Sequence, residues 1–189
     1  TIGITTMSQE IDKEPIHIED AEKFGDVWLK RLNKYVGRFL FAHKTPHHLK
    51  TELYDLTFSS PLTFAAFKSD LDIMSIWMRL GLGGGCLKTT LKDKRDGNAK
   101  PRLQDVVHNG EEGLLNALGL PGEGVDSLLS TVSSHPLMKG LAPIGMSIGG
   151  NTVDEYLSVF KLIQASVNAK HTRVGYYELN ISCPNTPEG

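Results

Sequence analysis

Apolar residues recur at three- and four-residue intervals between about residues 20 and 44, which is the spacing of one face of a helix. These positions are Phe24, Val27, Trp28, Leu32, Tyr35, Val36, Phe39 and Leu40. Lysines and arginines fall mostly between them, and Thr45-Pro46 ends the pattern. The sequence therefore predicts an N-terminal amphipathic helix. Two partners for its apolar face stay open, the folded domain itself or a bilayer surface.

Short apolar runs alternate with helical patterns in the rest of the chain. Residues 53–58 and 62–66, separated by a turn at 59–61, predict a short hairpin leading into a buried strand. Further strands are predicted at 83–91, 142–149 and 174–181, and helices at 70–80, 125–132 and 153–169. Glycine and proline make 92–103 and 113–124 irregular. This alternation predicts right-handed βαβ units and a parallel sheet of about four strands.

Length limits what this sheet can be. An eight-stranded (β/α)8 barrel typically needs around 250 residues, and this chain has 189. Four units therefore predict either an open sheet or half of a barrel.

Composition excludes some classes of function. The net charge is −2 and the basic residues are scattered, so no nucleic-acid partner is expected. No apolar run approaches 18 residues, and the two cysteines lie far apart, which favours a reduced, cytoplasmic protein. Residues 1–9 are small and polar and are interpreted as a leader. His43, His47 and His48 show no metal-ligand pattern, and no metal is expected.

Four segments carry motifs in a fixed order. They are Leu87-Lys-Thr-Thr90, Gly97-Asn-Ala-Lys-Pro-Arg102, Leu115-Asn-Ala-Leu-Gly-Leu-Pro121 and Asn180-Ile-Ser-Cys-Pro-Asn185. Each is weak alone, but together they resemble the dihydroorotate dehydrogenases. The resemblance runs from about Leu53 to Gly189.

The resemblance implies the N-terminal half of a TIM barrel, preceded by the amphipathic helix and the hairpin. Residues 1–52 would form an N-terminal extension and residues 53–189 the partial barrel, which binds flavin mononucleotide (FMN). The implied reaction oxidises dihydroorotate to orotate in pyrimidine (UMP) biosynthesis. Because the family holds the flavin phosphate through loops after strands seven and eight, the isolated half is expected to be inactive without the C-terminal half.

The chemistry of this reaction indicates roles for particular residues. A proton must leave one ring carbon and a hydride its neighbour; the flavin takes the hydride, so the protein supplies a base. Cys183 is the candidate base, since thiols need only a modest shift to ionise near neutral pH. The resemblance assigns the substrate to a set of amides and to backbone beside them. These residues are Asn116, Asn180, Asn185, Leu118, Gly119 and Leu120.

Cofactor contacts are also implied. Lys88 would stabilise negative charge on the reduced flavin and bind substrate. Thr89 and Asn180 would hydrogen-bond the cofactor, while Ala65 and Ala66 would give a flat platform for its ring. Phe67 stands where the family usually has glycine.

Several alternatives remain open at this point. The chain could be a related flavin barrel acting on another pyrimidine or enone, or a non-catalytic half-barrel interaction module. The cysteine base favours a soluble electron acceptor, fumarate or NAD, whereas the N-terminal helix favours a quinone and a peripheral location at the inner membrane. Candidate partners are the missing C-terminal half, as a separate chain, and a second copy in a homodimer.

Overall fold

The computed structural model describes residues 18–169 and 171–186. The interpreted leader at residues 1–9 and the last three residues of the predicted C-terminal loop lie outside this range. The elements are α1 (Ile18–Leu40), η1 (His47–Leu49), β1 (Thr51–Leu53), β2 (Leu56–Phe58), β3 (Thr63–Phe64), α2 (Leu71–Arg79), β4 (Gly84–Thr90), β5 (Leu103–His108), β6 (Glu111–Asn116), α3 (Val125–Val132), η2 (Pro136–Lys139), β7 (Ile144–Ile148), α4 (Val153–Asn168) and β8 (Tyr177–Leu179).

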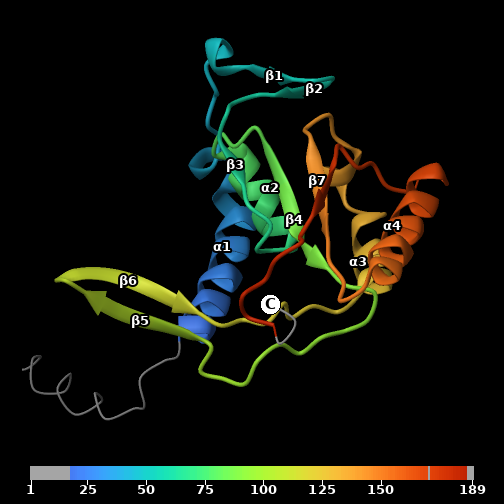
Figure 1. Cartoon of the computed structure of the whole chain (residues 1–189). Coiled ribbons are helices and arrows are strands. Elements are labelled where there is room, and N and C mark those ends of the chain that lie inside the picture. The colour runs from blue at the N-terminus through green and yellow to red at the C-terminus, as the bar shows by residue number, and fades with distance from the viewer. Residues whose placement is uncertain (1–17, 170, 187–189) are drawn as a thin grey trace, which may run out of the picture.

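The central sheet is parallel and has the strand order β3-β4-β7-β8 (Figure 1). Helices α2, α3 and α4 connect its strands and bury their apolar faces against it. Fully buried core residues come from both layers, for example Met74 of α2, Leu87 of β4 and Ile163 of α4. This arrangement is half of a TIM barrel and confirms the predicted fold class.

Two glycines leave space for aromatic rings that pack against the strands. Gly85 of β4 pairs with Phe64 of β3, and a Cβ atom at Gly85 would lie 2.4 Å from the Phe64 ring. Gly145 of β7 meets the Tyr176 ring in the same way, again at 2.4 Å. Each glycine therefore provides the space that a cross-strand aromatic ring fills.

The predicted hairpin exists, but its turn was placed wrongly. β1 and β2 pair antiparallel with Leu53 opposite Leu56, so the turn is Tyr54-Asp55 and not residues 59–61. Tyr54 adopts a left-handed conformation (φ 53°), which closes this two-residue turn. Residues 63 and 64 instead pair with β4 as the first strand of the parallel sheet.

A second hairpin was not predicted. β5 and β6 pair antiparallel through six residue pairs around Asn109-Gly110, both of which have positive φ. The hairpin projects beside the N-terminal end of α1, as Figure 1 shows, and β6 is exposed along its length. The end of β6 therefore lies in the segment 113–124, which was predicted to be irregular.

Helix α1 confirms the predicted amphipathic helix but turns its apolar face outward. Phe24, Tyr35 and Phe39 are 66%, 77% and 87% exposed. Its polar residues contact the barrel instead; for example, Lys30 pairs with Asp70, the residue that caps α2. No helix among the described residues combines the length and apolar content needed to cross a bilayer.

Candidate active site

Three polar side chains connect the carboxyl ends of neighbouring strands. The Thr89 hydroxyl of β4 shares a hydrogen bond with the Ser147 hydroxyl of β7 at 2.9 Å. The Asn180 side chain, directly after β8, donates to Thr89 Oγ1, also at 2.9 Å. Thr89 is 5% exposed and Ser147 fully buried. The structure therefore places Thr89 and Asn180, both predicted cofactor residues, in direct contact at the edge of the sheet where barrel enzymes bind ligands.

A second pair of predicted residues also meets. Asn185 Nδ2 donates to Asn116 Oδ1 at 3.0 Å, which joins the C-terminal loop to the end of β6. Asn98 holds both segments, because its side-chain amide donates to the Asn185 and Ala117 carbonyls at 2.9 Å. A Cβ atom at Gly119 would lie 2.8 Å from the Asn98 side chain, and Gly119 has φ 72°. Glycine is thus required here, next to the predicted backbone lining.

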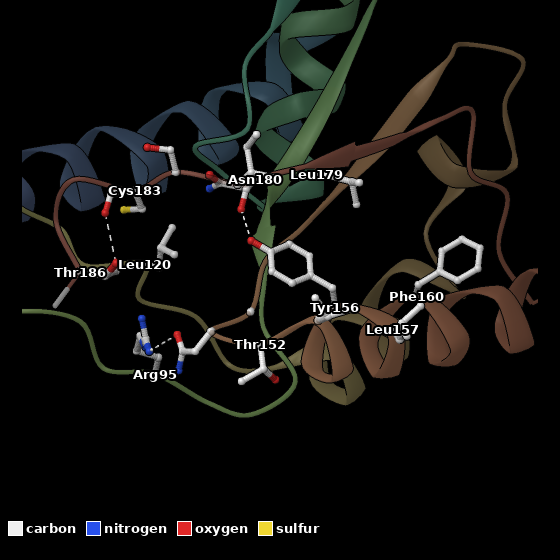
Figure 2. Close-up of a pocket in the computed structure, with 15 residues that line it drawn as sticks. Arg95, Leu120, Thr152, Tyr156, Leu157, Phe160, Leu179, Asn180, Cys183 and Thr186 are labelled. Atoms are coloured by element: carbon white, nitrogen blue, oxygen red, sulfur yellow. Dashed lines mark hydrogen bonds between the residues drawn. The ribbon is translucent and has the colours of Figure 1, made fainter. Parts of the chain in front are cut away.

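A cavity of about 580 Å³ is lined by Asn180 and by residues of the loop after it. Figure 2 shows Cys183 and Leu120 on one wall, Tyr156 on another, and Arg95 at the rim. The Tyr156 hydroxyl donates to the Asn180 carbonyl. Thr186 donates from its amide and hydroxyl to the Cys183 carbonyl, which fixes the turn that carries the thiol. Asn180, Cys183 and Leu120 therefore face one space.

The two cysteines differ in accessibility, and neither forms a disulfide. Cys86 is 2% exposed, and burial, with a further contribution from Glu178, raises the pKa of its thiol to about 12. Cys183 is partly exposed on the cavity wall. Of the two cysteines, only Cys183 lines this cavity.

Lys88 lies one residue before Thr89, beside a second cavity of about 250 Å³ between β4 and the start of α3. Burial, and then the nearby Arg102 guanidinium, lower the pKa of Lys88, while Glu22 and Glu19 oppose this effect. Within residues 18–169 and 171–186, no carboxylate forms an ion pair with Lys88. A partly buried ammonium without a counter-ion favours an anionic ligand.

The remaining predicted positions are Ala65, Ala66 and Leu118. Ala65 and Ala66 form the turn after β3, where the Phe67 amide donates to the Ala65 carbonyl at 2.8 Å. The Phe67 ring stacks on Trp77 of α2, with centroids 5.7 Å apart. The Leu118 carbonyl accepts from the backbone N–H of Asn98 at 3.1 Å. The roles of these residues toward a ligand stay predictions.

Sequence reasoning missed four residues of the site, namely Ser147, Tyr156, Asn98 and Arg95. Ser147 gave a signal, because it is a polar residue inside an otherwise apolar strand. Asn98 lies within a motif that the sequence analysis quoted, but no role was given to it. Nothing local distinguishes Tyr156 or Arg95, since the fold alone brings them to the cavity.

Comparison with known proteins identifies the family. The family model described as dihydroorotate dehydrogenase matches residues 48–189. The chain belongs to the dihydroorotate dehydrogenase family. Within this family it is similar to relatives of different types. The catalytic subunit of dihydroorotate dehydrogenase B (NAD(+)) from Fusobacterium nucleatum is 31% identical over 75% of this chain and 44% of its own length.

Two further dihydroorotate dehydrogenases differ in the acceptor that they name. Dihydroorotate dehydrogenase A (fumarate) of Lactobacillus delbrueckii is 36% identical over 57% of this chain and 33% of its length. Dihydroorotate dehydrogenase (quinone) of Vibrio vulnificus is 29% identical over 89% of this chain and 49% of its length. The chain therefore spans about half the length of these relatives, or less.

Solved dihydroorotate dehydrogenase structures share the fold. DHODH from Eimeria tenella in complex with ferulenol superimposes with a TM-score of 0.66 and 20% identity, covering 94% of this chain and 47% of that one. Its ligand-free form gives a TM-score of 0.61 over 88% of this chain and 47% of that one. The structural likeness thus agrees with half of a TIM barrel.

Proposed function

We propose that this chain is part of an FMN-dependent dihydroorotate dehydrogenase, which oxidises dihydroorotate to orotate in pyrimidine biosynthesis. The observation that carries the proposal is that Cys183 and Asn180 line one cavity, with Thr89 bonded to Asn180 and Asn116 bonded to Asn185, two residues after Cys183. Family membership supports it.

The reaction assigns separate tasks to these residues. A new carbon-carbon double bond forms when a proton leaves one ring carbon and a hydride leaves its neighbour. Cys183, which lines the cavity, accepts this proton as its thiolate. Asn116 and Asn185 offer amide donors and acceptors that match a ring bearing imide and carboxylate groups. Their mutual hydrogen bond preorganises this recognition.

The residues present fit a flavin. FMN, when bound, accepts the hydride. Thr89 and Asn180 provide a hydroxyl and an amide at the strand ends, and the small side chains of Ala65 and Ala66 leave room for a flat ring. Lys88 provides a positive charge that no carboxylate of the described residues neutralises at ion-pair distance. Such a fixed cation stabilises negative charge that develops in a bound ring.

The electron acceptor is left out of the proposal, because relatives named for NAD, fumarate and quinone all match this chain. Among the described residues β8 pairs only with β7, so the outer edge of β8 is unpaired. We assign that edge to further barrel strands of the complete enzyme, on the same polypeptide or a companion. A cytoplasmic location, peripheral to the inner membrane if α1 contacts lipid, stays a prediction.

Anaerobic addition of dihydroorotate to the flavin-loaded, complete protein tests the function. We expect loss of the oxidised-flavin absorbance and formation of orotate. Cys183→Ala should slow this bleaching by at least about 100-fold while flavin stays bound, since positioned bases contribute roughly 10²–10⁴-fold. Ser134→Ala, on an exposed turn after α3, is the remote control. Absence of bleaching in the unmodified protein would refute the proposal, and flavin loss in Cys183→Ala would refute the role of Cys183.

A further inference from the structure

The face of α1 that meets the barrel is a stripe of polar residues spaced three and four positions apart. Its contacts are Glu19 with Arg102, Glu22 and Asp26 with Lys68, Lys30 with Asp70, and Asn33 with Arg79. Residues at this spacing lie on one side of a helix. The apolar side chains described above lie on the opposite side. α1 is therefore docked to the barrel through charge.

The central contact of this stripe holds Lys68. Its ammonium lies 2.5 Å from Glu22 Oε1 and 2.5 Å from Asp26 Oδ2. The Lys68 side chain is only 11% exposed. Burial alone would lower the pKa of Lys68, but the bonds to Asp26 and Glu22 outweigh burial and raise it. Lys68 is thus a charged, largely buried group whose position depends on two carboxylates of α1.

Lys68 connects α1 to the candidate active site. It follows Ala65-Ala66 in the loop after β3, and its carbonyl accepts the backbone N–H of Lys88 at 3.0 Å. The same loop ends at Asp70, which accepts from the Ile73 amide as the cap of α2 and pairs with Lys30 of α1. α1 therefore fixes this loop at two points, one of which is bonded to the strand end that carries Lys88.

The charged groups around Lys88 also connect this residue to α1. Arg102 and Lys68 are the cations near its ammonium, and Glu22 and Glu19 of α1 are the carboxylates that balance them. Without Glu22 and Asp26, Lys68 would be a partly buried cation with no counter-ion beside a second cation. The Lys68 side chain would then have to move, and Lys88 would lose part of its compensating charge.

We propose that Glu22 and Asp26 are positioning residues that act through Lys68 to hold Lys88 in place for a planar, carboxylate-bearing ring ligand. The inference rests on the proposed function, which makes Lys88 a substrate and flavin contact. It adds a role for α1, whose polar face becomes part of the support of the site.

The test compares Glu22→Gln/Asp26→Asn with the unmodified complete protein in its flavin-loaded form. Both substitutions keep side-chain size and remove charge. Asp20→Asn is the control, because it repeats the Asp26→Asn substitution on the same helix at a side chain that is 52% exposed. Orotate affinity is measured from the flavin absorbance change between pH 6 and about pH 10, a range that reaches the ordinary lysine pKa. Steady-state turnover with dihydroorotate is measured in parallel.

We expect the double variant to bind orotate about 5- to 20-fold more weakly and to raise KM by a similar factor. Loss of Glu22 removes a group that raises the pKa of Lys88. As the pH rises, orotate affinity should therefore begin to fall at a lower pH in the variant than in the unmodified protein. Asp20→Asn should match the unmodified protein. Asp26→Glu, which keeps a carboxylate at position 26, should keep most of the orotate affinity.

Each other outcome decides against the inference. An unchanged orotate affinity and pH profile in a folded double variant would overturn it, even if stability fell. If the double variant does not fold, Asp26→Asn alone, with Glu22 retained, must show the same direction of change, and normal affinity there overturns the inference. An unmodified protein that binds no orotate overturns the proposed function and this inference together, whereas normal binding unaffected by the variants overturns only the inference.

Discussion

Replacing Thr89 by valine isolates the hydrogen bonds that join three strands of the sheet. Valine has nearly the same shape as threonine and keeps the β-branched side chain that suits a strand. It removes the hydroxyl that bonds to both Ser147 and Asn180. The variant therefore changes polar contacts with little change in packing.

The cost follows from the burial of the two groups left behind. The Ser147 hydroxyl is fully buried, and an unpaired buried polar group costs about 1–3 kcal/mol. Asn180 is only partly buried, so loss of its bond costs about 0.5–1.5 kcal/mol. Thr89→Val should thus lower the free energy of unfolding by about 2–4 kcal/mol. Ser147→Ala leaves the Thr89–Asn180 bond intact and should cost about 1 kcal/mol.

A double-mutant cycle in urea tests this reasoning. Unfolding is followed by tryptophan fluorescence, to which Trp77 contributes beside Phe64, with ring centroids 6.0 Å apart. Thr89→Val/Ser147→Ala removes the unpaired hydroxyl and should cost about 1–2 kcal/mol less than the sum of the single variants. Thr131→Val, an exposed position on α3, controls for the chemical change. Additivity within about 0.5 kcal/mol would refute the argument.

Two further predictions concern thiol accessibility and pH. A disulfide-exchange reagent at pH 8 should label Cys183 but not Cys86 in the folded protein, because burial raises the pKa of Cys86 to about 12; equal labelling rates would contradict this. Glu19→Gln should destabilise the protein at pH 7, because it removes the carboxylate charge and one of the two oxygens that accept from Arg102 at 2.8 and 3.2 Å. The Arg102 bond lowers the pKa of Glu19 from its ordinary value of 4.5, so its stabilisation is present above that value and is lost as pH falls through the lowered pKa. The difference between the two proteins in urea midpoint should therefore shrink in acid, and a constant difference would argue against the ion pair.

The parallel sheet could be predicted because its central strands β4 and β7 are buried on both faces and its helices have apolar stripes. The β5–β6 hairpin could not be found by burial, since β6 is exposed throughout. It had one local signal that went unused, the Asn109-Gly110 pair, whose left-handed conformations suit a two-residue turn. The outward orientation of α1 was beyond the sequence, because periodicity identifies an apolar face but not the surface that it meets. The division of the chain near residue 52 stays a prediction.

The candidate site was predicted from motifs and completed by the fold. The bonds between Thr89 and Asn180 and between Asn116 and Asn185 join predicted residues that are 91 and 69 positions apart. No local pattern could reveal such pairs. Ser147 was missed because a serine within an apolar strand gives no partner, and only the register of β4 with β7 brings it to Thr89.

The aromatic rings packed over glycine have a consequence for the evolution of this chain. A side chain larger than hydrogen at position 85 would meet the Phe64 ring, and one at position 145 would meet the Tyr176 ring, both at 2.4 Å. Neither glycine can change first, whereas a smaller residue at 64 or 176 leaves only a cavity. The order of substitutions is therefore constrained. The aromatic residue must be replaced by a smaller one before the glycine is replaced by a larger one. Natural relatives should show positions 64 and 85, and likewise 145 and 176, varying as pairs.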